Sequence, residues 1–444
     1  MGPRVSGAPE GLVSVRGLLA LAVPSAAFVL LTNGYRVVDQ YYVQGVSIDA
    51  QAAVGSSIFV LLVLFAAAEL VACGVGPLVA RATGAGDDAE RRRVIGTGIV
   101  LLILGSMVVG GLGALSAGPI SRLLGLQGGA AVACEEYLRA LCWTILPLFL
   151  TPLLDQAFLA MGNARVPLAL HGVSLVLNLV LTPLMVFDLG WGVAGAAYAA
   201  NLTRGVATTM GLLLLARATG TGRAELRWGP DVGRIVRVGW PIASGTVFYS
   251  LVYWAMLHTS ISPLGPQVNA ALGVGFSALE GVTWPLFHGV ALATASFVGR
   301  YLGAGRPDLA RQMVRRSLPL IGTLGVLATL AFGVGGEYLT GLFTDDLAVH
   351  RAATIYAQAL AWSQLAVALE TLEEGILSGS GATRAIFWGS VPLNILRVPL
   401  AWVLAFPCGW GALGVWWAIN LTTYAKTLVK GWVVWRGRWS TVQI

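Results

Sequence analysis

Long apolar runs separated by short polar breaks recur through the whole chain, and they restrict its fold more than any other feature. The runs lie at roughly 17–39, 52–80, 94–118, 135–161, 167–187, 193–217, 234–258, 269–302, 314–340, 352–380, 386–406 and 411–435. About 20 apolar residues let a helix cross the hydrocarbon core of a bilayer, whereas an open sheet edge cannot satisfy its backbone groups there. We therefore predict an all-α integral membrane protein with twelve transmembrane helices.

The chain has too few charges to cover a water-exposed surface. Hydrophobic residues make up 56% of its 444 residues and charged residues only 11%, whereas soluble domains are about 25% charged. The basic residues behind the net charge of +7 lie between apolar runs and form no nucleic-acid-binding surface. The four cysteines form no CxxC pair, and no metalloprotease or Walker motif is present. We expect a protein that is not an enzyme and has no cofactor, no resident metal and no nucleic-acid partner.

Basic residues are concentrated in alternate loops, for example at Arg91–Arg93, Arg165 and Arg384. Apart from Lys426 and Lys430, every basic residue is an arginine. Because loops rich in Lys and Arg stay on the cytoplasmic side, we predict that both termini are cytoplasmic. We expect the protein to be a multi-pass protein of the bacterial inner (cell) membrane, a location that this charge pattern does not itself determine.

The two halves of the sequence repeat each other. Four landmarks recur 219 residues apart: VARATGAGDDAERRR (79–93) with VGRYLGAGRPDLARQ (298–312), GNAR (162–165) with GATR (381–384), GWGVAG (190–195) with GWGALG (409–414), and AANLT (199–203) with AINLT (418–422). NLVLTP (178–183) also parallels NILRVP (394–399). We predict a six-helix lobe at 1–217, a cytoplasmic linker at 218–233 and a second six-helix lobe at 234–444, related by a pseudo-twofold axis. Two such bundles favour a transporter over a channel.

In its order of motifs, nearly the whole chain resembles the multidrug and toxic compound extrusion (MATE) family. VDQYYVQGVSIDAQAAVG (38–55) resembles the family's helix 1–2 signature, and LVARATGAG and FVGRYLGAG resemble its helix 2–3 and 8–9 turns. GNARVP and LSGSGATR resemble its turns after helices 4 and 10. The resemblance implies two lobes, a V-shaped central cavity and export driven by inward movement of H⁺ or Na⁺.

Ionisable residues inside apolar runs are costly and are usually functional or paired. Asp39 ends the first run, with Tyr35 and Arg36 one turn earlier; Arg36 could instead form a structural pair with Asp39. By the resemblance, Asp39 matches the family's helix 1 carboxylate and Asn178 its helix 5 asparagine. That motif reads NLVLTP here, so a threonine stands where the family often has a second Asp.

Asp155 completes the predicted ion site, because it falls near a position where the family often has Asn. We infer that the lobe's second carboxylate has moved to helix 4. The predicted ion-coupling set is therefore Asp39, Asp155, Asn178, Tyr35 and Arg36, with Asp39 and Asn178 as the ligands if the ion is Na⁺.

A second group of acids lies in the other half. Glu370, Glu373 and Glu374 share one helical face, where three carboxylates cannot all be cheaply ionised. Glu374 is also the repeat partner of Asp155. Pairing with Arg397 is the alternative to a cavity role. We predict that these acids line a substrate cavity together with the residues Glu280, Arg397 and Asn394.

These observations predict a secondary active multidrug efflux antiporter. It exports amphipathic, cationic organic compounds in exchange for H⁺ rather than Na⁺, and it works as a monomer in contact with membrane lipid. A lipid-linked oligosaccharide flippase of the same superfamily is the first alternative and predicts a cationic cavity; an ion channel is the second.

Overall fold

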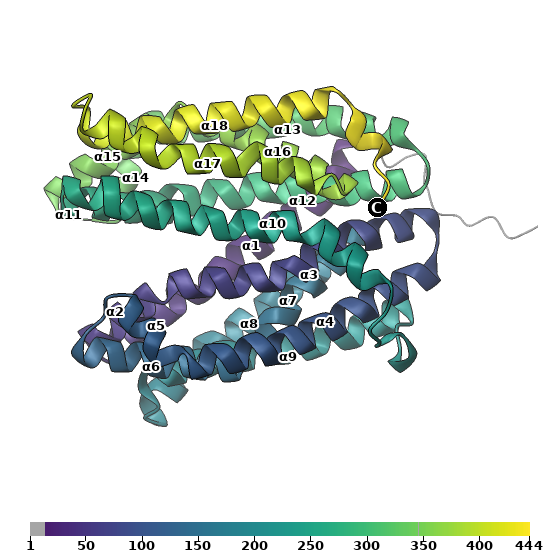
Figure 1. The fold of residues 1–444 in the computed structure, drawn as a ribbon, viewed down its shortest axis with the longest axis horizontal. Coiled ribbons are helices and arrows are strands. Elements are labelled where there is room, and N and C mark those ends of the chain that lie inside the picture. Colours follow the sequence, from purple (N-terminus) through teal and green to yellow (C-terminus); the bar gives the residue numbers. More distant parts are fainter. Residues whose placement is uncertain (1–13, 345) are drawn as a thin grey trace, which may run out of the picture. The chain divides into compact units, whose positions relative to one another are not determined.

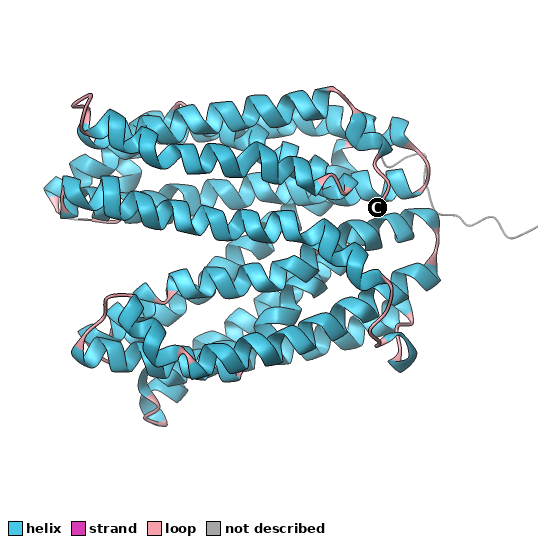
Figure 2. Cartoon of the chain, viewed as in Figure 1, coloured by secondary structure: helices cyan, strands magenta, loops and turns pink. Residues whose placement is uncertain are grey.

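The computed structural model describes residues 14–344 and 346–444, and the regular elements of this part of the chain are all helical (Figures 1 and 2). The first half contains α1 (Val15–Val43), α2 (Ile48–Ser56), α3 (Ile58–Ala85), α4 (Asp88–Leu115), α5 (Ala117–Leu123), α6 (Gly128–Trp143), α7 (Leu146–Ala160), α8 (Arg165–Pro183) and α9 (Gly192–Thr219). The second half contains α10 (Asp231–Met256), α11 (Pro266–Val274), α12 (Gly281–Gly303), α13 (Pro307–Gly333), α14 (Gly336–Gly341), α15 (Leu347–Ala361), α16 (Gln364–Ser380), α17 (Thr383–Ala405) and α18 (Gly411–Trp435). Each predicted apolar run lies on one of these helices or on consecutive helical segments.

Eight helical segments in the described residues are long and apolar enough to cross a membrane, and the number rises to ten if two bent pairs each count as one span. The bent pairs are α6 with α7, at 55°, and α15 with α16, at 60°. The remaining two predicted spans lie on α9 and α18, which are 28 and 25 residues long and are not among these ten. The predicted fold class is confirmed.

The chain divides into two compact units. The first unit is Phe28–Ala243, and the second unit consists of the described residues before Phe28 together with Ser244–Ile444. Both divisions fall inside helices, α1 and α10. The predicted linker at 218–233 holds a short 3₁₀ turn, Arg223–Glu225, and the first residues of α10.

The sequence repeat is also a repeat of backbone conformation. Gly162 follows α7 with φ 84°, and Gly381 follows α16 with φ 81°. A left-handed residue ends a helix cleanly, and glycine adopts that conformation without a Cβ clash. The two GNAR and GATR turns therefore end equivalent helices, 219 residues apart.

Two equivalent asparagines satisfy the carbonyl groups that the bends leave free. Asn201 on α9 donates from Nδ2 to the carbonyl of Leu141, at 3.0 Å, and to Thr144 Oγ1. Asn420 on α18 donates to the carbonyl of Ala359 at 2.7 Å. A break in a helix frees backbone groups that need partners where water is absent. This explains the physical role of the repeated AANLT and AINLT motifs.

Close packing against α12 fixes the position of α16, the helix of the second unit that carries Glu370, Glu373 and Glu374. A Cβ added to Gly375 would lie 2.5 Å from the carbonyl oxygen of Ala291, and one on Gly379 would meet the backbone at Ala295. Small residues spaced by four let two helices approach at their backbones. The approach fixes the rotation of α16 and thereby the direction of its glutamates.

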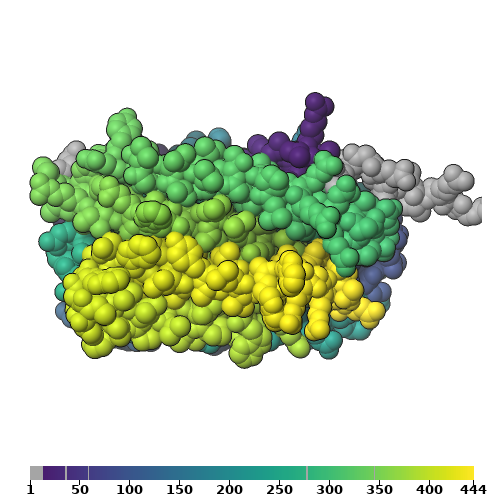
Figure 3. Space-filling view, turned by 90° about the horizontal axis from the view of Figure 1, so that it is seen from above, coloured from purple at the N-terminus to yellow at the C-terminus, as the bar shows by residue number. Residues whose placement is uncertain are grey.

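The surface of α18 is apolar on its outer side. This helix lies along one face of the second unit (yellow in Figure 3). Leu428 and Trp435 are 74% and 82% exposed, whereas Lys426 and Lys430 are buried. Apolar outside and charged inside is the reverse of a soluble helix, and it fits contact with lipid.

Candidate functional site

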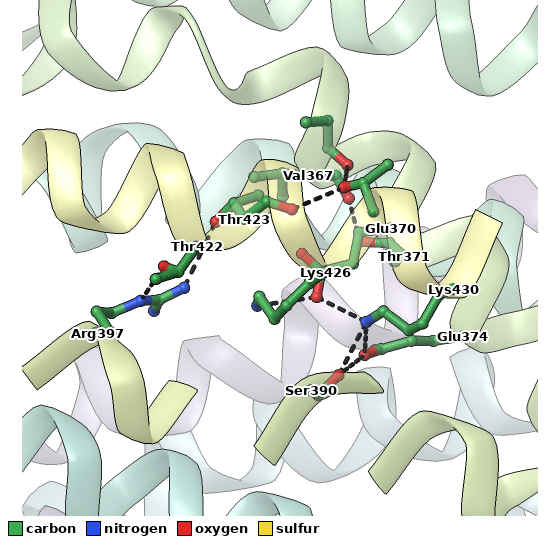
Figure 4. Close-up of polar contacts among 12 residues, drawn as sticks. Val367, Glu370, Thr371, Glu374, Ser390, Arg397, Thr422, Thr423, Lys426 and Lys430 are labelled. Carbon is green, nitrogen blue, oxygen red and sulfur yellow. Dashed lines mark hydrogen bonds and ion pairs between the residues drawn. The ribbon is translucent and has the colours of Figure 1, made fainter. Parts of the chain in front are cut away.

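The second unit holds a network of two glutamates and two lysines between α16 and α18, in which Glu370 and both lysines are buried and Glu374 is partly exposed (Figure 4). Lys426 Nζ lies 2.8 Å from Glu370 Oε1. Lys430 Nζ lies 2.7 Å from the same oxygen and 2.6 Å from Glu374 Oε1. It also donates to Ser390 Oγ on α17, at 2.9 Å. All three donors of the Lys430 ammonium group are thus used.

The spacing of the sequence explains why these groups meet. Glu370 and Glu374 are one turn apart on α16, and Lys426 and Lys430 are one turn apart on α18. Residues at i and i+4 share a helix face, so two packed helices bring the pairs together in register. A buried charge is tolerable when it is paired and hydrogen-bonded.

Arg397 does not neutralise these glutamates in the described part of the chain. Its Nε donates to Thr422 Oγ1 at 2.8 Å, and its terminal nitrogens donate to Thr423 Oγ1 and Tyr253 OH, each at 3.5 Å. Lysines occupy the place that the alternative interpretation gave to Arg397. The pairing of the acids with Arg397 is therefore replaced by pairing with Lys426 and Lys430.

The other predicted cavity residues of the second unit form no hydrogen bond or ion pair with this network among the described residues. Tyr356 on α15 donates its hydroxyl to Glu280 Oε1. Trp416 packs edge-on against the Tyr356 ring, with centroids 4.8 Å apart. Asn394 on α17 is 4% exposed. Glu373 has a buried carboxylate oxygen, Oε2, without a hydrogen-bond partner among the described residues.

The first unit holds an equivalent pair between α7 and α8. Asp155 Oδ2 lies 3.0 Å from His171 Nε2. The other ring nitrogen, Nδ1, lies 3.5 Å from Thr32 Oγ1 on α1, and Phe28 stacks on the imidazole with centroids 5.5 Å apart. The ring is thus held by contacts to both nitrogens and to one face.

A cavity of about 10 Å³ opens beside this pair. Its polar lining consists of Tyr35, Thr151, Asp155, His171, Ser174, Arg204 and Thr208. Arg204 lies over the Tyr35 ring, 4.2 Å from its centroid. A space of this size holds about one water molecule when polar groups surround it.

Near the C-terminal end of α1, several buried polar atoms have no hydrogen-bond partner among the described residues. Asp39 is 6% exposed, and its Oδ1 accepts no hydrogen bond within the described residues. Both amide atoms of Asn178 and the hydroxyl of Thr182 on α8 are buried and unpaired in the same part of the chain. The helices α1 and α8 are neighbours, since Tyr42 OH donates to the carbonyl of Leu179. The side chain of Arg36 lies outside the described residues.

The constant spacing of the repeat corrects one predicted equivalence. The helix-ending glycines on both sides of α8 and α17 keep an offset of 219, at Gly162 with Gly381 and at Gly190 with Gly409. Asn178 therefore corresponds to Arg397, and the parallel between NLVLTP and NILRVP is out of register by three residues. Asparagine in one unit and arginine in the other make the two units electrostatically different at this position.

Sequence reasoning missed three residues of these clusters. Lys426 and Lys430 lie in the last apolar run and His171 lies in the fifth, and none of them was predicted to belong to a site. The repeat carried the signal for His171, because its partner at the offset of 219 is Ser390, which donates to Glu374 at 3.2 Å. The pairs Asp155–His171 and Glu374–Ser390 are equivalent.

Membrane-crossing helices in two repeated units, with ionisable groups inside each, are typical of an integral membrane transporter. The family model for MatE matches residues 24–184 and 241–403, and the chain belongs to this family. Members of the family are transporters, which confirms the resemblance and the prediction that the chain is not an enzyme.

Individual relatives cover most of the chain. A probable multidrug resistance protein NorM of Rhizobium meliloti is 28% identical over 441 residues, covering 94% of this chain and 92% of that protein. An FAD transporter of Shewanella oneidensis is 23% identical over 350 residues, covering 76% of each chain. A solved multidrug resistance MATE family transporter of the MOP superfamily, in an outward-facing conformation, matches with a TM-score of 0.89 at 19% identity, covering 96% of this chain and 97% of that one. This last likeness shows the fold.

Proposed function

We propose that the protein is a secondary antiporter that exports amphipathic organic cations in exchange for H⁺ across a bacterial inner membrane, with both termini cytoplasmic. It acts as a monomer in contact with lipid. The first unit carries the exchange, and Asp39, Asp155, Asn178 and Tyr35 are its ion-coupling residues.

The observation that carries this proposal is the set of unpaired polar atoms at Asp39, Asn178 and Thr182. A buried polar atom without a partner is costly, so such atoms mark places that a bound proton, ion or water satisfies. The relatives named as multidrug resistance proteins support drugs as the exported compounds. Arg204 supports H⁺ over Na⁺, because its guanidinium lines the same cavity as Asp155 and its positive charge opposes a metal cation there.

Pairing with the two lysines reduces the number of acids in the second unit that can attract a cationic substrate. Glu370 and Glu374 are neutralised by Lys426 and Lys430, so they offer little net charge to an organic cation. Glu373 keeps a partly unpaired carboxylate. We therefore assign the attraction of a cationic substrate in the second unit to Glu373 and Glu280 more than to their neighbours.

Coupling follows if ion and drug favour different states of the transporter. A ligand shifts a conformational equilibrium only by its difference in affinity for the two states. In this proposal, protonation of Asp39 favours one open state of the transporter and the bound drug favours the other. Inward H⁺ movement and outward drug movement are linked because each ligand shifts the same equilibrium in the opposite direction.

The test is transport in proteoliposomes with an imposed pH or Na⁺ gradient and a panel of cationic and anionic dyes. We expect cationic dye uptake that follows the pH gradient and is lost in Asp39→Asn. The matched control is Asp308→Asn, which removes an exposed carboxylate whose partner is Arg306 on the surface. Dye movement that ignores both gradients would contradict antiport, ion conductance alone would indicate a channel, and movement of lipid-linked sugars alone would indicate the flippase.

A further inference from the structure

The repeat allows the two charge clusters to be compared position by position. With the offset of 219, Thr151 corresponds to Glu370, Asp155 to Glu374 and His171 to Ser390. These positions line the cavity in the first unit. In the second unit the equivalent residues bind an ammonium group.

The difference arises on the last helix of each unit. Ala207 and Gly211 on α9 correspond to Lys426 and Lys430 on α18. Ala207 lines the first-unit cavity, and an added Cβ on Gly211 would meet Leu154 and Leu170. In the first unit the small Ala207 therefore borders a cavity and leucine side chains pack against Gly211, whereas in the second unit two lysines bring charged groups to the equivalent positions. These are the only two lysines of the whole sequence.

Lys430 is bound as a free cation would be. It is fully buried, and its ammonium nitrogen contacts Glu370 Oε1, Glu374 Oε1 and Ser390 Oγ at 2.6–2.9 Å. Its side chain tethers the cation to the site, so a cation from solution competes with a partner at high effective concentration. Two carboxylates are balanced by two ammonium groups, Lys426 being the second.

We propose that Lys430 is a built-in cation that occupies a monovalent-cation site in the second unit. This site of the second unit then takes no coupling cation from solution, and ion exchange is confined to the first unit, where the equivalent residues Thr151, Asp155 and His171 line a cavity. The confinement to the first unit rests on the proposed antiport, whereas occupancy of the site by Lys430 does not.

The prediction that follows is chemical rescue. Lys430→Gly installs the residue found at the equivalent position of the first unit and vacates the space of the lysine side chain, which ends between Glu370, Glu374 and Ser390. Methylammonium should raise the unfolding temperature of this variant, and the shift should grow with the logarithm of its concentration. Choline at equal ionic strength has a quaternary nitrogen with no N–H to donate to Glu370, Glu374 and Ser390, and it should give no shift.

Two further proteins serve as controls. The wild-type protein should show no methylammonium shift, and neither should Lys430→Met, which fills the space with an uncharged chain of similar length. A shift of equal size in the wild type, or none in Lys430→Gly, would overturn the proposal.

If Lys430→Gly is recovered in low yield, it is purified in parallel with methylammonium and with choline. Recovery of folded protein with methylammonium but not with choline supports the site. Should it fail in both, Lys430→Gly with Glu374→Gln removes one charge of each sign and keeps Glu370 and Ser390. Methylammonium binding to that protein in calorimetry supports the site, and its absence overturns it. These measurements do not depend on transport. The proposed cation site can therefore be tested whether or not the protein shows antiport in proteoliposomes.

Discussion

Replacing Glu370 should destabilise the protein far more than the same change at Glu374. Glu370 is 8% exposed, and its Oε1 contacts both lysine ammonium groups. Glutamine there leaves Lys426, whose side chain is 9% exposed, without a carboxylate among the described residues. Removing one partner of a buried ion pair costs about 3–5 kcal/mol.

The Glu374 side chain is 41% exposed, so solvent screens its charge. In Glu374→Gln, Lys430 keeps Glu370 and Ser390 as partners. The cost should therefore be about 1 kcal/mol or less, as for exposed pairs. The chemical change is the same in both variants, but the replaced glutamate is buried in one and partly exposed in the other. Only Glu370→Gln leaves a buried lysine without a carboxylate partner.

The assay is reversible unfolding of the purified protein in detergent, followed by circular dichroism. A double-mutant cycle with Lys426→Met separates lost attraction from uncompensated charge. Glu370→Gln with Lys426→Met should regain most of the lost stability, because a buried pair is often replaced by apolar groups without penalty. Equal destabilisation by Glu370→Gln and Glu374→Gln, or no recovery in the double variant, would refute the reasoning.

Three further outcomes follow from packing and exposure. Gly375→Ala should destabilise by about 1–3 kcal/mol through overpacking against α12, whereas Gly322→Ala, with open space around it, should be neutral or slightly stabilising in the same unfolding assay. Asn420→Ala should cost about 1–3 kcal/mol by orphaning the Ala359 carbonyl; a change within error would show that the bend needs no side-chain partner. Cys408 is exposed between α17 and α18, so a membrane-impermeant maleimide should label it in intact cells if the predicted orientation holds, and labelling only after lysis would reverse that orientation.

The positions of the spans could be predicted from the sequence because they depend on local composition. A run of about 20 apolar residues has one stable solution in hydrocarbon, whichever helices surround it. The repeat was equally readable, since matching glycines such as Gly162 and Gly381 impose the same backbone turn wherever they occur. The prediction of paired positions at Asp155 and Glu374 also depended only on that spacing.

The partners of the buried charges could not be predicted in the same way. Lys430 is 56 residues from Glu374, and whether they meet depends on the rotation of α16 and α18 about their axes. Sequence periodicity alone offered Arg397 as a partner instead. Tertiary packing chose between them, because close contact of Gly375 with α12 turns the glutamates toward α18.

The sequence by itself therefore determined that this chain crosses a membrane in two repeated units with acids buried in both. Those properties follow from apolar length, charge placement and backbone chemistry, which are local. Only the tertiary structure decided that the acids of the second unit hold Lys426 and Lys430 while Asp155 in the first unit faces His171 and a cavity. That outcome depends on which helix faces meet. The rotation of each helix about its axis is set by packing against its neighbours and not by its own sequence.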